Sequence, residues 1–393
     1  MKTSNLHLAV ALDGAGWHPA AWREPRARPR ELFRARPWVE HVREAERGLL
    51  DFVTLEDSHG LQSTVADVAD DRTDRVRGRL DAIMLAARVA PLTRGVGIVA
   101  AADTTVTEPF LLSTQVATLD FVSRGRAGWL LQVSTGERDA GYVGPRLVPE
   151  PGARYDEATE YVEVVRQLWD SWEDDAEIRD AASNRFFDRR RVHHIDHAGT
   201  HFSVKGPSIT PRSPQGQPVV AALVLGAAQK ALAAATADVI IVPAKDDRQL
   251  ATAPERIADA VAAAGREPAE VRVLADAVVF LGPDRTATLE RRHRLDALAG
   301  ASHGADALVF TGTPAELADV LLDWRELGYD GFRLRPGAIP HDLDQVTRAL
   351  VPELVRRGAF RPRYEADTLR GLLGFNRPAG RSVPRSSAGA AIT

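Results

Sequence analysis

The chain contains no cysteine, and this absence excludes several kinds of chemistry. Its 393 residues include no Cys, so the chain has no disulfide bond, no thiolate metal site, no iron–sulfur cluster and no cysteine nucleophile. Lysine is scarce as well, since it occurs only at Lys2, Lys205, Lys230 and Lys245. We attribute the excess of arginine to a compositional bias of the genome and not to phosphate recognition.

The sequence also lacks a strong charge of one sign and a long apolar run. It has 50 basic and 54 acidic residues, a net charge of −4, and so no basic stripe for nucleic acid. Residues 1–20 do not have the charged start and apolar core of a signal peptide. Polar residues interrupt the most apolar stretch, Pro218 to Ala244, so no span of about 20 apolar residues exists. We expect a cytoplasmic protein that binds neither nucleic acid nor membrane.

Three common catalytic and nucleotide-binding motifs are absent too. The sequence has no G-x-G-x-x-G before a helix, no phosphate-binding P-loop and no G-x-S-x-G elbow. Its 44% hydrophobic and 26% charged residues are ordinary for a globular protein with a sizeable core.

Short apolar runs alternate with longer helical patterns along the chain. Continuous apolarity is typical of parallel strands that are covered on both faces. Eight such runs occur, at Leu6–Leu12, Phe52–Leu55, Val96–Ala101, Gly128–Val133, Val219–Leu225, Val239–Val242, Val271–Leu281 and Gly331–Leu334. Nearly every run is followed by a helical pattern, which predicts a (β/α)₈ TIM barrel instead of an open sheet.

The predicted helices and the length of the chain define the remaining organisation. Helical patterns cover Pro37–Arg47, Asp81–Val89, Glu108–Phe121, Tyr155–Trp172, Gln229–Thr236, Ala253–Ala264, Pro314–Leu327 and Leu343–Arg357. A plain barrel needs about 250 residues, so we expect a long insertion, 145–217, between the fourth and fifth strands, with a hairpin at His193–Pro207. Residues 1–380 then form a single domain, and the small polar residues 381–393 form a disordered tail.

Active sites of such barrels lie at the carboxyl ends of the strands. That rule selects Asp13, Trp17, His18, Glu56, Asp57, His59, Asp103, Thr104, Thr105, Gln132, Ser134, Thr135, Val224 to Gly226, Lys245 and Asp246. Asp57 is as compatible with a cap on the next helix as with a ligand contact. His59 is a weak catalytic candidate, because simple solvation beside Gly60 explains it equally well.

Two further hypotheses concern metal binding and lysine chemistry. His193, His194, Asp196, His197 and His201 form the one dense histidine cluster. Because alternate residues of a strand point to opposite faces, we expect a polar hairpin there and no metal site. Lys245 would serve a Schiff-base lyase if it were buried, but the adjacent Asp246 and Asp247 favour a solvated loop.

Several segments together resemble a known family. The segment TTVTEPFLLSTQVATLDFVSRGRAGW (Thr104–Trp129) resembles the bacterial luciferase-like, flavin-dependent monooxygenases, in the branch with nitrilotriacetate and dibenzothiophene-sulfone monooxygenases. Supporting segments follow in order at Arg154–Ala176, His193–Pro207, Pro214–Val220, Ala235–Ile240, Gly312–Leu321, Tyr329–Leu334 and Val351–Phe375. The resemblance therefore runs through most of the chain.

This resemblance implies a (β/α)₈ barrel and a specific cofactor chemistry. It implies reduced FMN as a co-substrate, supplied by a separate NAD(P)H-dependent flavin reductase, and molecular oxygen, one atom of which enters a small organic substrate. The cofactor then carries the difficult chemistry, and the protein binds it and shields it from water. The wider superfamily also includes deazaflavin users. By analogy with luciferases, a homodimer or heterodimer is expected.

The family's cofactor contacts carry over to some positions and not to others. Asp57, Thr104, Thr105 and Tyr155 match flavin-contacting positions. Apolar residues replace polar ones at three places: Leu130 stands for an Asn, Pro151 for a His, and Leu225 with Gly226 for the two serines that hold the FMN phosphate.

These replacements leave three interpretations open. In the first interpretation, the chain is a working monooxygenase whose phosphate contacts are rebuilt from backbone N–H groups at Gly226 and from Lys230. Alternatively, it is a non-catalytic homologue or subunit with a degenerate flavin site, or else a Schiff-base lyase that uses Lys245. The substrate does not carry over from the resemblance.

Overall fold

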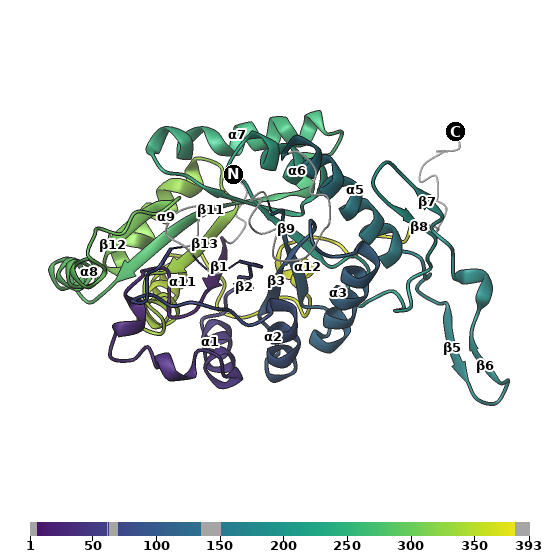
Figure 1. The fold of residues 1–393 in the computed structure, drawn as a ribbon, viewed down its shortest axis with the longest axis horizontal. Coiled ribbons are helices and arrows are strands. Elements are labelled where there is room, and N and C mark those ends of the chain that lie inside the picture. The colour runs from purple at the N-terminus through teal and green to yellow at the C-terminus, as the bar shows by residue number, and fades with distance from the viewer. Residues whose placement is uncertain (1–5, 61, 63–69, 135–150, 382–393) are drawn as a thin grey trace.

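Eight parallel strands close into a barrel in the computed structural model, which describes residues 6–60, 62, 70–134 and 151–381 (Figure 1). The strands are β1 (His7–Leu12), β2 (Phe52–Leu55), β3 (Gly97–Asp103), β4 (Ala127–Gln132), β9 (Val219–Leu223), β10 (Val239–Pro243), β11 (Arg272–Leu281) and β13 (Gly331–Pro336). They pair in this order, and pairing of β13 with β1 closes the ring. Each coincides with one predicted run, so the predicted barrel is confirmed.

A ninth strand, β12 (Leu308–Gly312), lies beside the barrel and was not predicted. It pairs with β11, which is ten residues long. The first half of β11 pairs with β10, up to Asp276, and the second half pairs with β12, from Ala277 onward. Because β11 continues past the end of β10, β12 covers the edge that β11 would otherwise expose.

Helices surround the strands in the positions that the sequence predicts. They are α1 (Ala35–Arg47), α2 (Ala82–Val89), α3 (Pro109–Ser123), α5 (Pro151–Trp169), α6 (Ala227–Thr236), α7 (Asp247–Ala263), α9 (Pro314–Glu326), α10 (His341–Gln345) and α11 (Val351–Arg356). A π-helical turn, Val346–Leu350, joins the last two. At the start of α9, Thr313 and Glu316 form a capping box, which satisfies backbone donors of the first turn.

Two helices escape the sequence prediction. The helix α8 (Arg285–Ala299) buries Thr288, Arg291, Leu295 and Ala299, so its inner face carries only two apolar side chains. The short helix α12 (Leu369–Leu372) has four residues. Neither has the broad apolar stripe on which helix prediction depends.

The segment between β4 and β9 adds two hairpins to the barrel. One pairs β5 (Glu177–Asp180) with β6 (Arg185–Phe187) and projects away from the barrel (Figure 1). The other pairs β7 (His197–Ala198) with β8 (Ser203–Val204), where the sequence predicted a hairpin. The helix α5 packs against both α3 and α6, within the ring of helices. The predicted tail lies, except for Arg381, outside the described residues.

The described helices include none that is long and apolar enough to cross a membrane.

Candidate active site

Asp57 follows β2 at the carboxyl end of the barrel, where its side chain bonds to the first turn of α2. One carboxylate oxygen accepts a hydrogen bond from the Ser58 backbone N–H at 2.7 Å, and the other accepts from the N–H of Ala82, the first residue of α2, at 2.8 Å. Burial raises the pKa of Asp57. The side chain of Gln132, at the end of β4, donates to the Asp57 carbonyl at 3.3 Å. Asp57 therefore satisfies one backbone N–H of the first turn of α2, whose N-cap residue is Asp81, and a ligand contact of Asp57 stays a prediction.

A second hydrogen-bonded group ties the end of β3 to the end of β4. The buried Asp103 carboxylate accepts from the Thr105 N–H at 2.7 Å and from the Ser134 hydroxyl at 2.6 Å, and burial raises its pKa. The Thr104 hydroxyl donates to the Gln132 carbonyl at 3.2 Å, and the Thr105 hydroxyl donates to the Ser134 carbonyl at 3.4 Å. These predicted flavin-contacting threonines are thus buried and shape the loops of the barrel mouth.

A cavity of about 300 Å³, the mouth cavity, lies over the ends of β4 and β9. Its polar lining comes from Asp57, Ser58, Asp103, Gln132, Ser134, Tyr155 and Gln229. Tyr155, on α5, forms a side-chain hydrogen bond with Gln229 on α6, and burial raises its pKa. The predicted positions Asp57 and Tyr155 therefore meet in one cavity although they lie far apart in the sequence.

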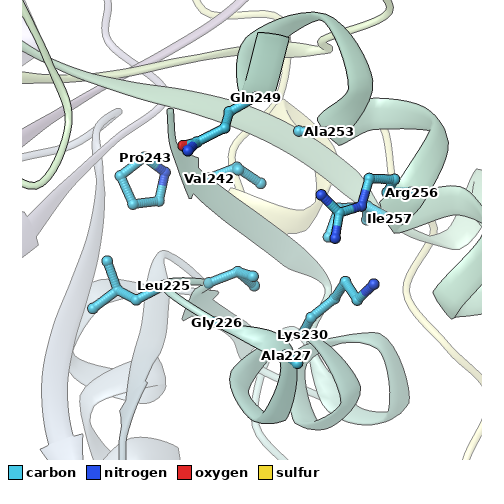
Figure 2. Close-up of a pocket in the computed structure, with 11 residues that line it drawn as sticks. Leu225, Gly226, Ala227, Lys230, Val242, Pro243, Gln249, Ala253, Arg256 and Ile257 are labelled. Carbon is cyan, nitrogen blue, oxygen red and sulfur yellow. The ribbon is translucent and has the colours of Figure 1, made fainter. Parts of the chain in front are cut away.

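A second cavity, the α6 cavity, has a volume of about 280 Å³ and lies between the amino end of α6 and α7 (Figure 2). Leu225 lines both cavities and is 58% exposed. Figure 2 shows Lys230, from α6, and Arg256, from α7, directed toward each other across the cavity. Neither has a carboxylate partner within the described part of the chain.

The amino end of α6 supplies further donors to this cavity. The helix begins after Gly226, which provides no side-chain cap, so N–H groups of the first turn remain available. Such a helix end attracts anions through its N–H groups and its dipole. Together with Lys230 and Arg256 it can hold a phosphate group.

Five other predicted residues line neither of these two cavities: His59, Thr104, Thr105, Leu130 and Lys245. Leu130 is buried in the barrel wall, and Gln132, two residues further on the same face of the strand, brings an amide to the mouth. Pro151 begins α5, and its side chain lies outside the described residues. His59 is exposed. Lys245 is exposed as well and precedes Asp246, the N-cap of α7.

The histidines of the predicted hairpin have separate partners. His193 contacts Glu173 at 2.7 Å, His194 contacts the Gly206 carbonyl at 2.8 Å, and His197 contacts Glu160 at 3.1 Å. Among the residues that the structure describes, no group of three or more His, Asp or Glu side chains is placed to hold a metal ion.

The barrel interior contains an ion-pair network that sequence reasoning missed. Both nitrogens of the Arg333 fork lie 2.9 Å from the Asp276 oxygens, and a third nitrogen lies 3.0 Å from Glu56. Arg335 binds Asp276 as well, at 2.7 Å, and Asp306 at 2.6 Å. Burial alone would raise the pKa of Asp276, but the two arginines hold it below its ordinary value.

The alternation of β13 is the signal that could have revealed this network. Phe332 packs against Trp324 of α9 with ring centroids 6.0 Å apart, so Phe332 faces the helices. Because successive residues of a strand point to opposite faces, Arg333 lies on the other face of β13, toward the barrel interior, and Arg335 lies on the same face as Arg333. The network includes Glu56, the residue that precedes Asp57.

Comparisons with known proteins give a consistent result. The sequence model described as luciferase-like monooxygenase matches residues 15–331. The chain is 30% identical to N-acetyl-S-(2-succino)cysteine monooxygenase of Bacillus subtilis (strain 168), an alignment that covers 97% of this chain and 99% of that protein. It is also 30% identical to nitrilotriacetate monooxygenase component A of Aminobacter aminovorans, with 95% and 97% covered.

Solved structures give the same fold. A crystal structure of a long-chain alkane monooxygenase superposes with a TM-score of 0.87 at 25% sequence identity, and the match covers 94% of this chain and 96% of that one.

Proposed function

This chain belongs to the luciferase-like monooxygenase family, and on that premise we propose that it is a catalytically competent enzyme that receives reduced FMN from a separate NAD(P)H-dependent reductase. The resemblance to the nitrilotriacetate and dibenzothiophene-sulfone branch is confirmed. The relative from Aminobacter aminovorans is named as one component of its enzyme, which supports a second, reducing component here.

The single observation that carries this proposal is the pair of cavities that meet at Leu225. Their volumes of about 280 and about 300 Å³ lie near the lower end of the range for small-molecule sites, and the two cavities together lie well within that range. We assign the mouth cavity to the flavin ring and the α6 cavity to the FMN phosphate. The unpaired cations and the uncapped helix end fit a dianion.

The residues of this chain then have distinct tasks. Lys230 and Arg256 neutralise the phosphate, and N–H groups at the amino end of α6 orient it. Gln132, Tyr155 and Gln229 present hydrogen-bonding groups to the ring from three different elements. Bound reduced flavin supplies the electrons that activate molecular oxygen, of which one atom enters the substrate and the other leaves as water.

A second candidate is a subunit that supports an active partner. The observation that favours it is the loss of hydroxyl groups at the phosphate position, where Leu225 is 58% exposed. Each lost hydrogen bond to a charged group costs roughly 1.5–3 kcal/mol. The cations Lys230 and Arg256 offset this loss in the first proposal, whereas in the second the flavin does not bind.

A titration under anaerobic conditions separates the two. The purified protein is titrated with reduced FMN, oxidised FMN and a deazaflavin, and binding is followed by flavin absorbance and fluorescence. We expect saturable binding of reduced FMN and none of the deazaflavin. Absence of saturable FMN binding in either redox state would rule out the enzyme and leave the subunit.

The variant Leu225→Ser tests the placement of the phosphate. A hydroxyl returned to this position adds a hydrogen bond to a charged group, so we expect FMN to bind about tenfold more tightly. Leu298→Ser is the control, because Leu298 is exposed on α8 and lines neither cavity. An unchanged affinity in Leu225→Ser would place the phosphate elsewhere.

A further inference from the structure

A third cavity, of about 230 Å³, follows β1 and is lined by two tryptophans and three arginines. These residues are Trp17, Trp22, Arg75, Arg77 and Arg79. Asp13 is the acidic residue of the lining. The proposed flavin assignment does not use this Arg–Trp cavity.

Two of the three arginines have their charge neutralised. Arg79 binds both oxygens of Asp13, at 3.1 and 2.5 Å. Arg77 pairs with Asp70. Burial lowers the pKa of His18, also in the lining, despite the contact with Asp296.

Arg75 is the arginine whose charge remains. Its Nε is buried and has no hydrogen-bond partner, and no carboxylate within the described ranges forms an ion pair with it. The acidic residue beside it in the sequence, Asp74, is held by Arg72 through two hydrogen bonds of 2.7 Å. The buried Nε is out of reach of a ligand, but the terminal nitrogens of Arg75 have no hydrogen-bond partner within the described ranges and are not buried, so an anion in this cavity would bind them.

The walls of the Arg–Trp cavity are held in place. The Trp22 indole N–H donates to the Asp74 carbonyl at 3.0 Å. The Arg335 guanidinium lies 5.9 Å from the centre of the Trp17 ring. His18 is fixed by Asp296 at 3.1 Å and by the Ala20 N–H at 3.0 Å. The cavity thus combines preformed aromatic walls with one cation that has no ion-pair partner among the described residues.

The Arg–Trp cavity lies at the carboxyl end of the barrel, as the mouth cavity does, although the two share no lining residue. Asp13 follows β1, the strand paired with β2, and Arg79 binds Asp13. Burial would lower the pKa of Arg79, but Asp13, Glu56 and Asp57 together raise it, so Arg79 lies within electrostatic reach of the residues that follow β2. Asp57 lines the mouth cavity.

We propose that the Arg–Trp cavity binds the carboxylate of an anionic organic substrate, with the Arg75 guanidinium as its counter-charge and Trp17 and Trp22 against its apolar part. A guanidinium presents a planar fork that matches a carboxylate. This inference rests on the proposed function, because the rest of the substrate would extend toward the flavin in the mouth cavity.

The test uses hydrocinnamate, its uncharged amide and phenylmethanesulfonate as probes of the full-length protein, with calorimetry and tryptophan fluorescence as readouts. We expect hydrocinnamate to bind saturably and at least about tenfold more tightly than the amide, since one charge-assisted hydrogen-bonded pair separates them. Equal affinity of the acid and the amide would overturn the proposal. Tighter binding of the sulfonate would overturn the choice of a carboxylate.

The variant Arg75→Gln should weaken hydrocinnamate binding about tenfold or more and leave the affinity for FMN unchanged. Arg30→Gln is the matched control, because Arg30 is exposed, lies outside the cavity and carries the same charge. If Arg75→Gln does not fold, Arg75→Lys takes its place, with a smaller loss expected because the planar fork is gone.

The outcomes also separate this inference from the proposed function. Carboxylate binding without FMN binding would refute the flavin enzyme and support the Arg–Trp cavity. FMN binding without carboxylate binding would refute only the inference. Loss of FMN affinity in Arg75→Gln, with hydrocinnamate binding intact, would assign Arg75 to the flavin site and overturn the inference as well.

Discussion

Leu225 and Arg75 are single residues whose roles follow from their partners. Leu225 is an apolar side chain that is mostly exposed between two cavities, and it therefore contributes little to the core. The family resemblance predicts that its position is the phosphate site, and this stays a prediction. The convergence of Lys230 and Arg256 was not predictable, because Arg256 comes from the next helix and nothing in its local sequence distinguishes it from the other arginines.

His303 gives a prediction for the pH dependence of stability. It lies beside His18, with ring centroids 5.1 Å apart, and its Nε2 is buried without a hydrogen-bond partner. Burial, with the nearby charges of His18 and Arg292, lowers its pKa from 6.5 to about 4. Because the folded pKa lies below the unfolded one, this group's contribution to stability is complete above pH 6.5 and is lost as the pH falls from there toward 4.

Urea unfolding at about pH 7 and about pH 5 tests this expectation. From about pH 7 to about pH 5, the free energy of unfolding of the wild type should fall more than that of His303→Asn. The difference between the two slopes should be at most about 1.4 kcal/mol per pH unit. The control His201→Gln, at an exposed histidine, should follow the wild type. Parallel curves for the wild type and His303→Asn would show that His303 is not buried in its neutral form.

At the scale of elements, β11 and β13 share a charge cluster inside the barrel. Asp276 of β11 holds Arg333 and Arg335 of β13, and all three side chains are buried. Both strands were predicted from their apolar residues. The charge cluster was not predicted. Asp276 and Arg333 are far apart in the sequence, and only the register of β11 and β13 shows that they are neighbours.

The variant Asp276→Asn should destabilise the protein strongly. It leaves two buried guanidinium groups without their shared counter-charge, which costs roughly 3–5 kcal/mol. The control Asp319→Asn removes an exposed carboxylate that pairs with Arg357 and should cost less than about 1 kcal/mol. Chemical denaturation of both variants gives the comparison. Equal losses would mean that the interior pairs contribute no more than surface pairs.

Other elements show where sequence patterns stop being informative. The eight barrel strands were recognisable because both of their faces are buried, which leaves continuous apolar runs. In contrast, the first three residues of β12 are only partly buried, and α8 buries an arginine and a threonine on its inner face. Their sequences therefore lack the regular periodicity that predicts a strand or a helix.

At the scale of the whole molecule, the barrel brings the candidate site together from distant segments. Asp57, Gln132, Tyr155 and Leu225 come from three strand–helix units, those that begin with β2, β4 and β9, and line one cavity. The sequence could place these residues at one end of the barrel, because the carboxyl ends of parallel strands share an edge. The sequence could not predict how this end of the barrel divides into separate cavities, because side chains from separate helices form the boundaries of the cavities.

The central claim is that Lys230 and Arg256 replace the lost hydroxyl groups as the anchor of the FMN phosphate. The most direct measurement is the dissociation constant of reduced FMN against that of reduced riboflavin, for the wild type and for Lys230→Gln/Arg256→Gln. Lys205→Gln/Arg30→Gln provides an equal change of charge away from the cavity. We predict that the wild type and this control bind FMN at least about tenfold more tightly than riboflavin, and that the Lys230→Gln/Arg256→Gln variant, which keeps only the N–H groups at the amino end of α6, loses most of this preference. Equal affinities of FMN and riboflavin in the wild type would contradict the account.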